Sequence, residues 1–204
     1  MASCQRTTPG TVSEGWRPLF DGTSKEGWEM TGPGEFSLED GTLASHGGMG
    51  LLWYTRETLG NCQIKVVFKL NGPEDNSGVF IRIPEPPADP WMAVNTGYEV
   101  QIDNNGDEYH RIGCLYSFTR ARTAARATVG EWSTFLITLD GPRTRVELDD
   151  ELITDFTEGD DVPAKRIWYE PERGRRPDVG YMGLQNHGDP AHVQFREVSV
   201  RALP

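Results

Sequence analysis

A chain of 204 residues is long enough for one domain with a sizeable core, and a single all-β sandwich can reach this length. The 23 glycines, the 14 prolines and the apolar fraction of 36% suit many short strands joined by turns better than a bundle of helices. The formal net charge of −11 argues against a nucleic acid and against an anionic membrane as partner, because a basic surface binds both.

The cysteines and the start of the chain bear on the cellular compartment. Cys4, Cys62 and Cys114 are too few and odd in number for a disulfide framework, and we expect the latter two to pack as small hydrophobic side chains. The sequence contains neither an apolar run long enough to span a bilayer nor a hydrophobic signal region near its start. We therefore expect a cytoplasmic protein. Because "ASC" at the start loosely resembles the end of a lipoprotein signal, a secreted protein or a lipoprotein is the alternative if the chain is trimmed.

The predicted elements are short strands separated by turn signals, which indicates an all-β sandwich or barrel. In chain order, we expect strands within residues 35–45, 62–70, 78–83, 97–102, 112–118, 132–140, 144–156, 180–188 and 192–203. Asp-Gly pairs at 40–41 and 140–141 predict two hairpins. We expect no helix longer than one or two turns, and residues 119–130, which lack an apolar stripe, are interpreted as a surface loop.

No linker or internal repeat divides the chain. We therefore predict a short, poorly ordered extension over residues 1–14 and one domain over residues 15–204. The one dense basic run, Arg173 to Arg176, lies between two prolines and is interpreted as a solvated loop.

Strict alternation places polar side chains on one face of several strands. In "YEVQID" (98–103), Glu99, Gln101 and Asp103 share a face, and the apolar residues share the other. The same rule groups further side chains on two other strands: Gly78, Phe80 and Arg82, and Gly183, Gln185 and His187. In residues 112–118, Ile112, Cys114 and Tyr116 share a face that can be either the buried or the exposed one. If the sheet curves, these faces line a groove whose aromatic and hydrogen-bonding groups suit a sugar.

Several stretches, specific in this order and spacing, resemble those of the 3-keto-disaccharide hydrolase domain family. They are "WRPLFDGTSKEGW" (16–28), "FSLEDGTLAS" (36–45), "DNSGVFIR" (75–82), "GYEVQID" (97–103), "GCLY" (113–116), "GEWSTFLITLDG" (130–141) and "GLQNHG" (183–188), followed by "VQFREVSV". Cys114, in place of a small residue, and Glu197, where asparagine is common, are mild departures. The resemblance implies a concanavalin A-like jelly roll, a β-sandwich of two antiparallel sheets. It also implies a small carbohydrate substrate, cleavage of 3-keto-glycosides and a functional link to a sugar 3-dehydrogenase.

A ketone at C3 of a sugar acidifies the hydrogen on C2, so a base can start an elimination that expels the group at C1, after which water adds. Such a site needs a base, an enolate stabiliser and a proton donor. We assign Glu99 as base and Arg82 as oxyanion donor, with Tyr116 or His187 as proton donor. The predicted substrate-binding residues are Gln101, Asp103, Gln185, Phe80 and Asn76. The alternatives are structural: Arg82 pairs with Glu99, and Tyr116 is a packed aromatic.

Two other functions share this fold. The strand at Glu99 resembles the Glu-x-Asp-x-(x)-Glu motif of laminarinase-type glycoside hydrolases, with Gln101 in the middle position and Asp103 at the end. Glu99 and Asp103 are about 13 Å apart along a strand, farther than the two carboxylates of a glycosidase, so that mechanism is disfavoured. A non-catalytic, lectin-like carbohydrate-binding module is the main alternative.

No cofactor is predicted. Calcium is one option, held by Asp103 and Asp107 or by Asp75 and Asn76. The spacing of His187 and His192 matches no recognised zinc motif, and surface or capping roles are the simpler interpretation of all four histidines, which include His46 and His110.

Overall fold

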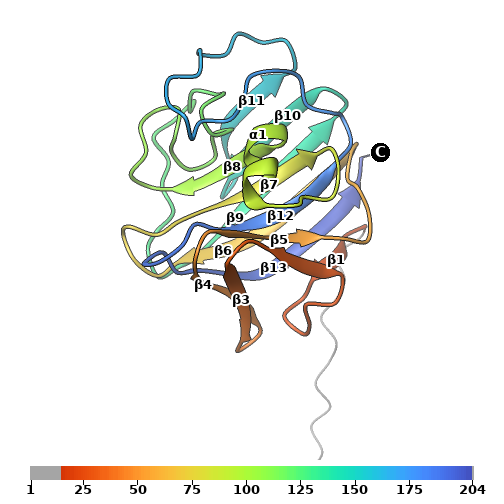
Figure 1. The fold of residues 1–204 in the computed structure, drawn as a ribbon, viewed down its shortest axis with the longest axis vertical. Helices are drawn as coiled ribbons and strands as arrows, with labels where there is room; N and C mark the ends of the chain where they lie inside the picture. Colours follow the sequence, from red (N-terminus) through yellow and green to blue (C-terminus); the bar gives the residue numbers. More distant parts are fainter. Residues whose placement is uncertain (1–14, 204) are drawn as a thin grey trace, which may run out of the picture.

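Two antiparallel β-sheets stacked on each other form the computed structural model, which describes residues 15–203 (Figure 1). The larger sheet has eight strands in the order β11-β10-β9-β6-β13-β4-β3, with β1 paired to β13. Its strands are β1 (Arg17–Phe20), β3 (Gly34–Glu39), β4 (Thr42–Gly47), β6 (Cys62–Leu70), β9 (Trp132–Asp140), β10 (Arg143–Leu148), β11 (Glu151–Thr157) and β13 (Val193–Ala202). This architecture confirms the predicted all-β, jelly-roll sandwich.

The smaller sheet has five strands in the order β2-β5-β12-β7-β8. They are β2 (Trp28–Thr31), β5 (Gly50–Tyr54), β7 (Asn76–Ile83), β8 (Tyr98–Asp103) and β12 (Tyr181–Asn186). The short helix α1 (Pro90–Thr96) lies over β7 and β8 (Figure 1). Asp89 caps this helix by accepting a hydrogen bond from the Met92 amide. Among the described residues, no helix is both long and apolar enough to cross a membrane.

The main core lies between the sheets, and a second, smaller cluster lies under α1. The apolar side chains of β8, at Tyr98, Val100 and Ile102, belong to the main core, as alternation predicts. Cys62 and Cys114 are buried, which confirms their predicted packing. The predicted extension over residues 1–14, which contains Cys4, lies outside the described residues.

Tight turns set the register of the hairpins. Asp40 and Gly41 both have positive φ, so β3 and β4 are joined by the two-residue, left-handed turn that Asp-Gly favours. The second predicted hairpin, at Asp140-Gly141, joins β9 to β10. Both predictions are confirmed, and residues 119–130 form the predicted loop.

The predicted strand at 112–118 is wrong. Gly113 and Ser117 have positive φ and break this segment into turns. The segment follows the free edge of β8, because the Gln101 amide donates to the Cys114 carbonyl and the Tyr116 amide donates to the Glu99 carbonyl. It therefore covers an edge that regular pairing leaves open. Strands β1, β2 and β5 were not predicted.

Candidate active site

A pocket of about 450 Å³ opens on the outer face of the five-stranded sheet. Strands β7, β8 and β12 form its floor, and α1 and two long loops form its walls. Its lining residues are Met49, Asn76, Trp91, Val94, Glu99, Gln101, Asp103, His110, Tyr116, Trp168, Tyr169, Gln185 and His187. Most of the predicted site residues are therefore brought together, whereas Arg82 and Phe80 are not among them. The roles assigned to these residues stay predictions.

Glu99 lies on the pocket floor and is half-buried. A Cβ atom at position 78 would collide with the Glu99 carboxylate, so Gly78 lets this side chain lie flat across β7. With its amide nitrogen turned toward these acceptors, Gln101 donates to Glu99 Oε1 (2.9 Å) and to the Ser77 carbonyl (3.1 Å). Burial raises the pKa of Glu99 to about 8, and a hydrogen bond from Gln185 opposes this rise only in part.

No lysine or arginine lies beside Glu99 among the described residues that line the pocket. Amide hydrogen bonds alone do not offset the desolvation of a carboxylate, which is why its proton is held so tightly. A carboxyl group that titrates near neutral pH in a cleft is a typical feature of a functional site.

Tyr116 and two histidines also line the pocket. Burial and the negative charge of Glu99 raise the pKa of Tyr116, so its phenol keeps its proton and can donate a hydrogen bond. The ring of His110 packs against Tyr116 with centroids 4.8 Å apart, and its Nδ1 lies 2.8 Å from Asp107 Oδ1. His187 is exposed at the mouth of the pocket; partial desolvation lowers its pKa, and the charge of Asp103 opposes this effect.

Three polar atoms around the pocket lack a hydrogen-bond partner among the described residues although they are buried. They are Asn76 Oδ1, His110 Nε2 and Gln185 Oε1. His110 Nε2 lies 3.8 Å from Glu170 Oε1. Buried polar atoms in native proteins are almost always paired, so the oxygens of Asn76 and Gln185 are available to a bound polar molecule. Asn76 uses its Nδ2 to donate to Asp103 Oδ2 at 3.4 Å.

Aromatic side chains form one wall of the pocket, and sequence reasoning missed them. The rings of Trp91, on α1, and Trp168 lie 5.4 Å apart, and Tyr169 stands edge-on to Trp168 at 5.5 Å. Trp168 is 76% exposed, which is unusual for so large an apolar side chain. The run "IWYE" (167–170) in an otherwise polar segment was the available signal.

Arg82 lies away from the pocket, so its predicted role at the oxyanion is wrong. Ile81 and Arg82 together oppose Met182, because β7 bulges between its pairings with Tyr181 and Gly183, and Arg82 has a φ of 57°. The bulge ends strict alternation and turns the guanidinium toward the other sheet. Arg82 is fully buried there. It donates to Thr144 Oγ1 and to the backbone carbonyls of Gly141, Arg143 and Pro177, and none of these four residues lines the pocket.

Phe80 does not line the pocket either. It is 1% exposed and belongs to the small apolar cluster under α1, with Leu51, Trp53, Ile83 and Val94. Its contribution is to seat the helix that carries Trp91, so its predicted contact with substrate is wrong.

The basic run at 173–176 is not the solvated loop that its composition predicts. Arg176 is 3% exposed and donates to backbone carbonyls, including that of Gly97 at 3.1 Å. Arg173 donates to Ser117 Oγ (2.9 Å) and to the buried carboxylate of Glu170 (3.2 Å). These contacts fix the loop that presents Trp168 to the pocket.

The predicted calcium ligands are engaged elsewhere. Asp75 is buried, and its carboxylate accepts hydrogen bonds from the amides of Asn71, Gly72 and His192, so it braces a loop. Asp107 binds His110, as described above. Within residues 15–203, one group of three side chains has metal-ligand geometry, and it contains neither aspartate.

A larger cavity of about 560 Å³ lies outside this pocket, between residues that include Tyr98, Phe118 and Phe156. Its acidic and phenolic side chains are paired within the protein: the Tyr98 hydroxyl donates to Glu158, and Asp160 accepts from the Thr157 amide. We therefore take the pocket around Glu99 as the candidate active site.

Solved structures share the fold. A candidate glycosyl hydrolase from Parabacteroides distasonis superimposes with a TM-score of 0.75 at 22% identity, covering 94% of this chain and 95% of its own. A second one from the same organism has a TM-score of 0.73 at 24% identity, covering 92% and 99%. The carbohydrate-binding module CBM66 from Bacillus subtilis has a TM-score of 0.58 at 14% identity, covering 86% and 96%. None of the curated proteins compared with the chain matches its sequence.

Residues 15–201 match the family described as the 3-keto-alpha-glucoside-1,2-lyase-like domain. The match spans nearly the whole described chain and agrees with the resemblance found in the sequence. A carbohydrate-related function follows from it. The chain belongs to the 3-keto-alpha-glucoside-1,2-lyase-like domain family.

Proposed function

We propose that the protein cleaves 3-keto-glycosides by elimination, with Glu99 as the base that removes the proton from C2. The observation that carries this proposal is the half-buried Glu99 carboxyl group on the pocket floor, whose pKa of about 8 suits a base that works near neutral pH. The name of the matching family, a 1,2-lyase acting on a 3-keto-alpha-glucoside, agrees with this reaction class.

The proposed reaction has two stages, an elimination that occurs in two steps and a hydration that follows it. The Glu99 carboxylate takes the C2 proton, and the electrons of the C–H bond form a C2=C3 double bond with the negative charge on the C3 oxygen. The ketone then reforms, a C1=C2 double bond appears, and the C1–O bond breaks, so that the leaving oxygen carries away its electron pair and receives a proton. Water adds across the C1=C2 bond afterward and gives the free 3-keto sugar.

The surrounding residues supply the other roles. Tyr116 keeps its proton and can donate to the enolate oxygen, which is the role that Arg82 is too remote to fill. We assign His187, at the mouth, as the proton donor to a leaving group that points toward solvent. Gln185 and Asn76 offer their unpartnered oxygens to sugar hydroxyl groups, and Trp168 offers a ring to the C–H face of the sugar.

Elimination also explains why one carboxylate can be sufficient. A two-carboxylate glycosidase needs a second acid at a defined distance from the first. Asp103 also lines the pocket, but it accepts hydrogen bonds from Asn105 and Asn76, which suits a binding role. A ketone substrate already provides the activation that the second acid would supply. The substrate would be made by an enzyme that oxidises the C3 hydroxyl, that is, a sugar 3-dehydrogenase.

The test is a comparison of a 3-keto-disaccharide with its unoxidised parent, followed by NMR in deuterated water. We expect cleavage of the keto sugar alone, with deuterium entering C2 of the product. The value of kcat/KM should rise about tenfold per pH unit below the pKa of Glu99 and level off above pH 8, because only the ionised carboxylate is a base.

Two outcomes would contradict the proposal. Cleavage of both sugars would indicate an ordinary glycosidase. Shifted protein resonances without product would indicate a carbohydrate-binding module, the second candidate function, which the aromatic wall and the fold shared with CBM66 favour.

A further inference from the structure

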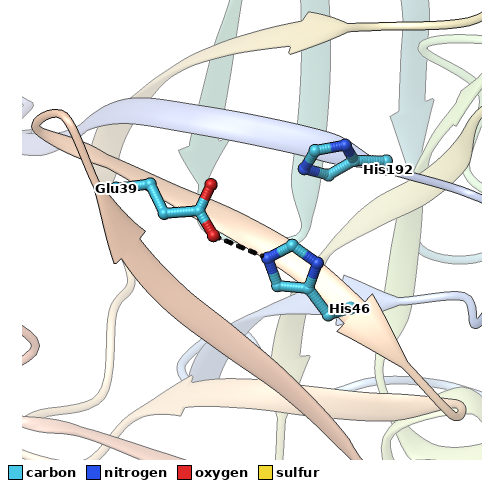
Figure 2. Close-up of side chains that lie close together, drawn as sticks. All are labelled: Glu39, His46 and His192. Carbon is cyan, nitrogen blue, oxygen red and sulfur yellow. Dashed lines mark hydrogen bonds and ion pairs between the residues drawn. The ribbon is translucent and has the colours of Figure 1, made fainter.

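Three metal-ligating side chains gather on the eight-stranded sheet, which does not carry the pocket. Glu39 ends β3, His46 lies on β4 and His192 directly precedes β13 (Figure 2). The pairing of Gln194 with Ala44 continues the antiparallel ladder so that His192 and His46 become neighbours, with ring centroids 5.0 Å apart. One ligand atom from each of the three side chains lies within 4.8 Å of the other two.

We propose that Glu39, His46 and His192 bind a divalent transition-metal ion, with zinc as the favoured ion. Two imidazole nitrogens and one carboxylate oxygen form a known zinc ligand set, and water can fill the fourth position. Tetrahedral zinc with these ligands needs its ligand atoms about 3.4 Å apart. His46 Nε2 and Glu39 Oε1 are 3.0 Å apart, and His192 offers a nitrogen within 4.8 Å of a ligand atom of each, so its ring must move closer to complete the triangle.

The unpaired ring nitrogen of His192 is a second observation that points to a bound ligand. Its Nε2 is buried and has no hydrogen-bond partner among the described residues. Figure 2 shows that this atom points toward the Glu39–His46 pair. A plain surface ion pair between Glu39 and His46, which would contribute little to stability, accounts for two of the three side chains and leaves this nitrogen unexplained.

Neighbouring groups hold the three ligands in place. The hydroxyl of Ser37 donates to Glu39 Oε1 and lies 2.7 Å from His46 Nε2, which fixes the carboxylate beside the imidazole. The amide of His192 donates to the buried carboxylate of Asp75 at 2.9 Å. Strands and a braced loop thus position the ligands before any ion binds, which lowers the ordering cost of binding.

The proposed ion would fasten the edge of the sheet. Strands β4 and β13 are paired over only two registered residue pairs, so the β3–β4 hairpin is held to the sheet by a short ladder. An ion shared by β3, β4 and the start of β13 adds a link that only the folded chain offers. Imidazole ligands also select against calcium and magnesium, which prefer oxygen ligands.

The experiment uses untagged, chelator-treated full-length protein, titrated calorimetrically with Zn²⁺, Ca²⁺ and Mg²⁺. We expect one zinc per chain and no binding of the other two ions. Zinc at about a hundred times its Kd should raise the Tm by roughly 5–10 °C. With Co²⁺ as a spectroscopic substitute, visible absorption typical of a tetrahedral site should appear.

Matched variants decide whether these residues are the ligands. His46→Gln and His192→Gln should each weaken zinc binding more than tenfold and remove the Co²⁺ spectrum, whereas His187→Gln, a histidine of the pocket, should leave both unchanged. The circular dichroism and zinc-free Tm of each variant check that it folds. Failure of the wild type to bind zinc, or equal binding by a folded His46→Gln, His192→Gln double variant, would overturn the proposal.

Discussion

Strand β8 of the smaller sheet and strand β6 of the larger sheet both turn polar side chains outward, yet these side chains have different surroundings. On β6, Lys65 lies 2.6 Å from Glu197 of β13, and both side chains remain partly exposed. On β8, Glu99 lies on the floor of a pocket that α1 and two loops wall, and it has amides as its partners. Similar alternation therefore produces a solvated surface on one sheet and a chemically perturbed carboxyl group on the other.

The difference lies in what covers each sheet. Segments 104–131 and 158–180 contain no regular strand or helix, and they wall the pocket with His110, Tyr116, Trp168 and Tyr169. Their ordering depends on arginine side chains: the half-buried Arg173 holds Glu170 and Ser117 together. Loops placed over a rigid sheet thus complete a pocket whose floor residues lie on the strands.

The largest expected difference between the two sheets is the effect on kcat/KM of replacing one carboxylate on each, Glu99 on the smaller sheet and Glu197 on the larger. We expect Glu99→Gln to lower kcat/KM on a 3-keto-disaccharide by about 10²–10⁴-fold, because the amide is nearly isosteric and cannot accept the proton. The matched variant Glu197→Gln should leave the rate unchanged and alter the free energy of unfolding by at most about 1 kcal/mol. Steady-state kinetics and urea unfolding measure both. An active Glu99→Gln would remove Glu99 from the mechanism.

The same pair of variants should differ in how stability depends on pH. The pKa of Glu99 rises from an unfolded value near 4.5 to about 8 in the folded protein. Between these values the unfolded chain releases the proton first, so Glu99 lowers the free energy of unfolding progressively from about pH 4.5 to pH 8, after which the penalty is constant. Below pH 4.5 both states hold the proton and the penalty vanishes.

Glu99→Gln removes this penalty. Its free energy of unfolding, relative to wild type, should therefore increase by about 2–3 kcal/mol between pH 6 and pH 9, which corresponds to roughly 5–10 °C in Tm. Glu197→Gln should show no comparable trend. Thermal unfolding followed across this pH range tests the expectation, and parallel curves for wild type and Glu99→Gln would mean that Glu99 titrates at its ordinary pKa.

The sequence predicts those parts of the site that depend on local periodicity. Glu99, Gln101 and Asp103 are brought together because β8 has no bulge, and Gln185 joins them from β12, which pairs in register with β5. Both Asp-Gly hairpins follow from the backbone preference of two residues.

The remaining parts depend on contacts between distant segments. The bulge that redirects Arg82 depends on how β7 pairs with β12, and alternation within one strand carries no sign of it. Trp168 lies in a loop without periodicity, so its place in the pocket follows from the packing of that loop. The proximity of His46 and His192 results from the register between β4 and β13, which the spacing of histidines along the chain cannot show.

The smallest effect that we expect is on sugar affinity, and it distinguishes a tryptophan of the aromatic wall from a tryptophan on the other sheet. Trp168 is mostly exposed, so Trp168→Ala should leave the Tm unchanged but weaken binding of a keto-disaccharide about three- to tenfold, the value of one sugar–aromatic contact. The matched residue is Trp132 on β9, whose ring lies under Lys69 and Arg196. Trp132→Ala should leave affinity unchanged.

Calorimetric titration into an inactive Glu99→Gln background measures binding without turnover. If the two tryptophan variants bind the sugar equally well, the sugar does not contact Trp168, and the polar floor alone must account for recognition.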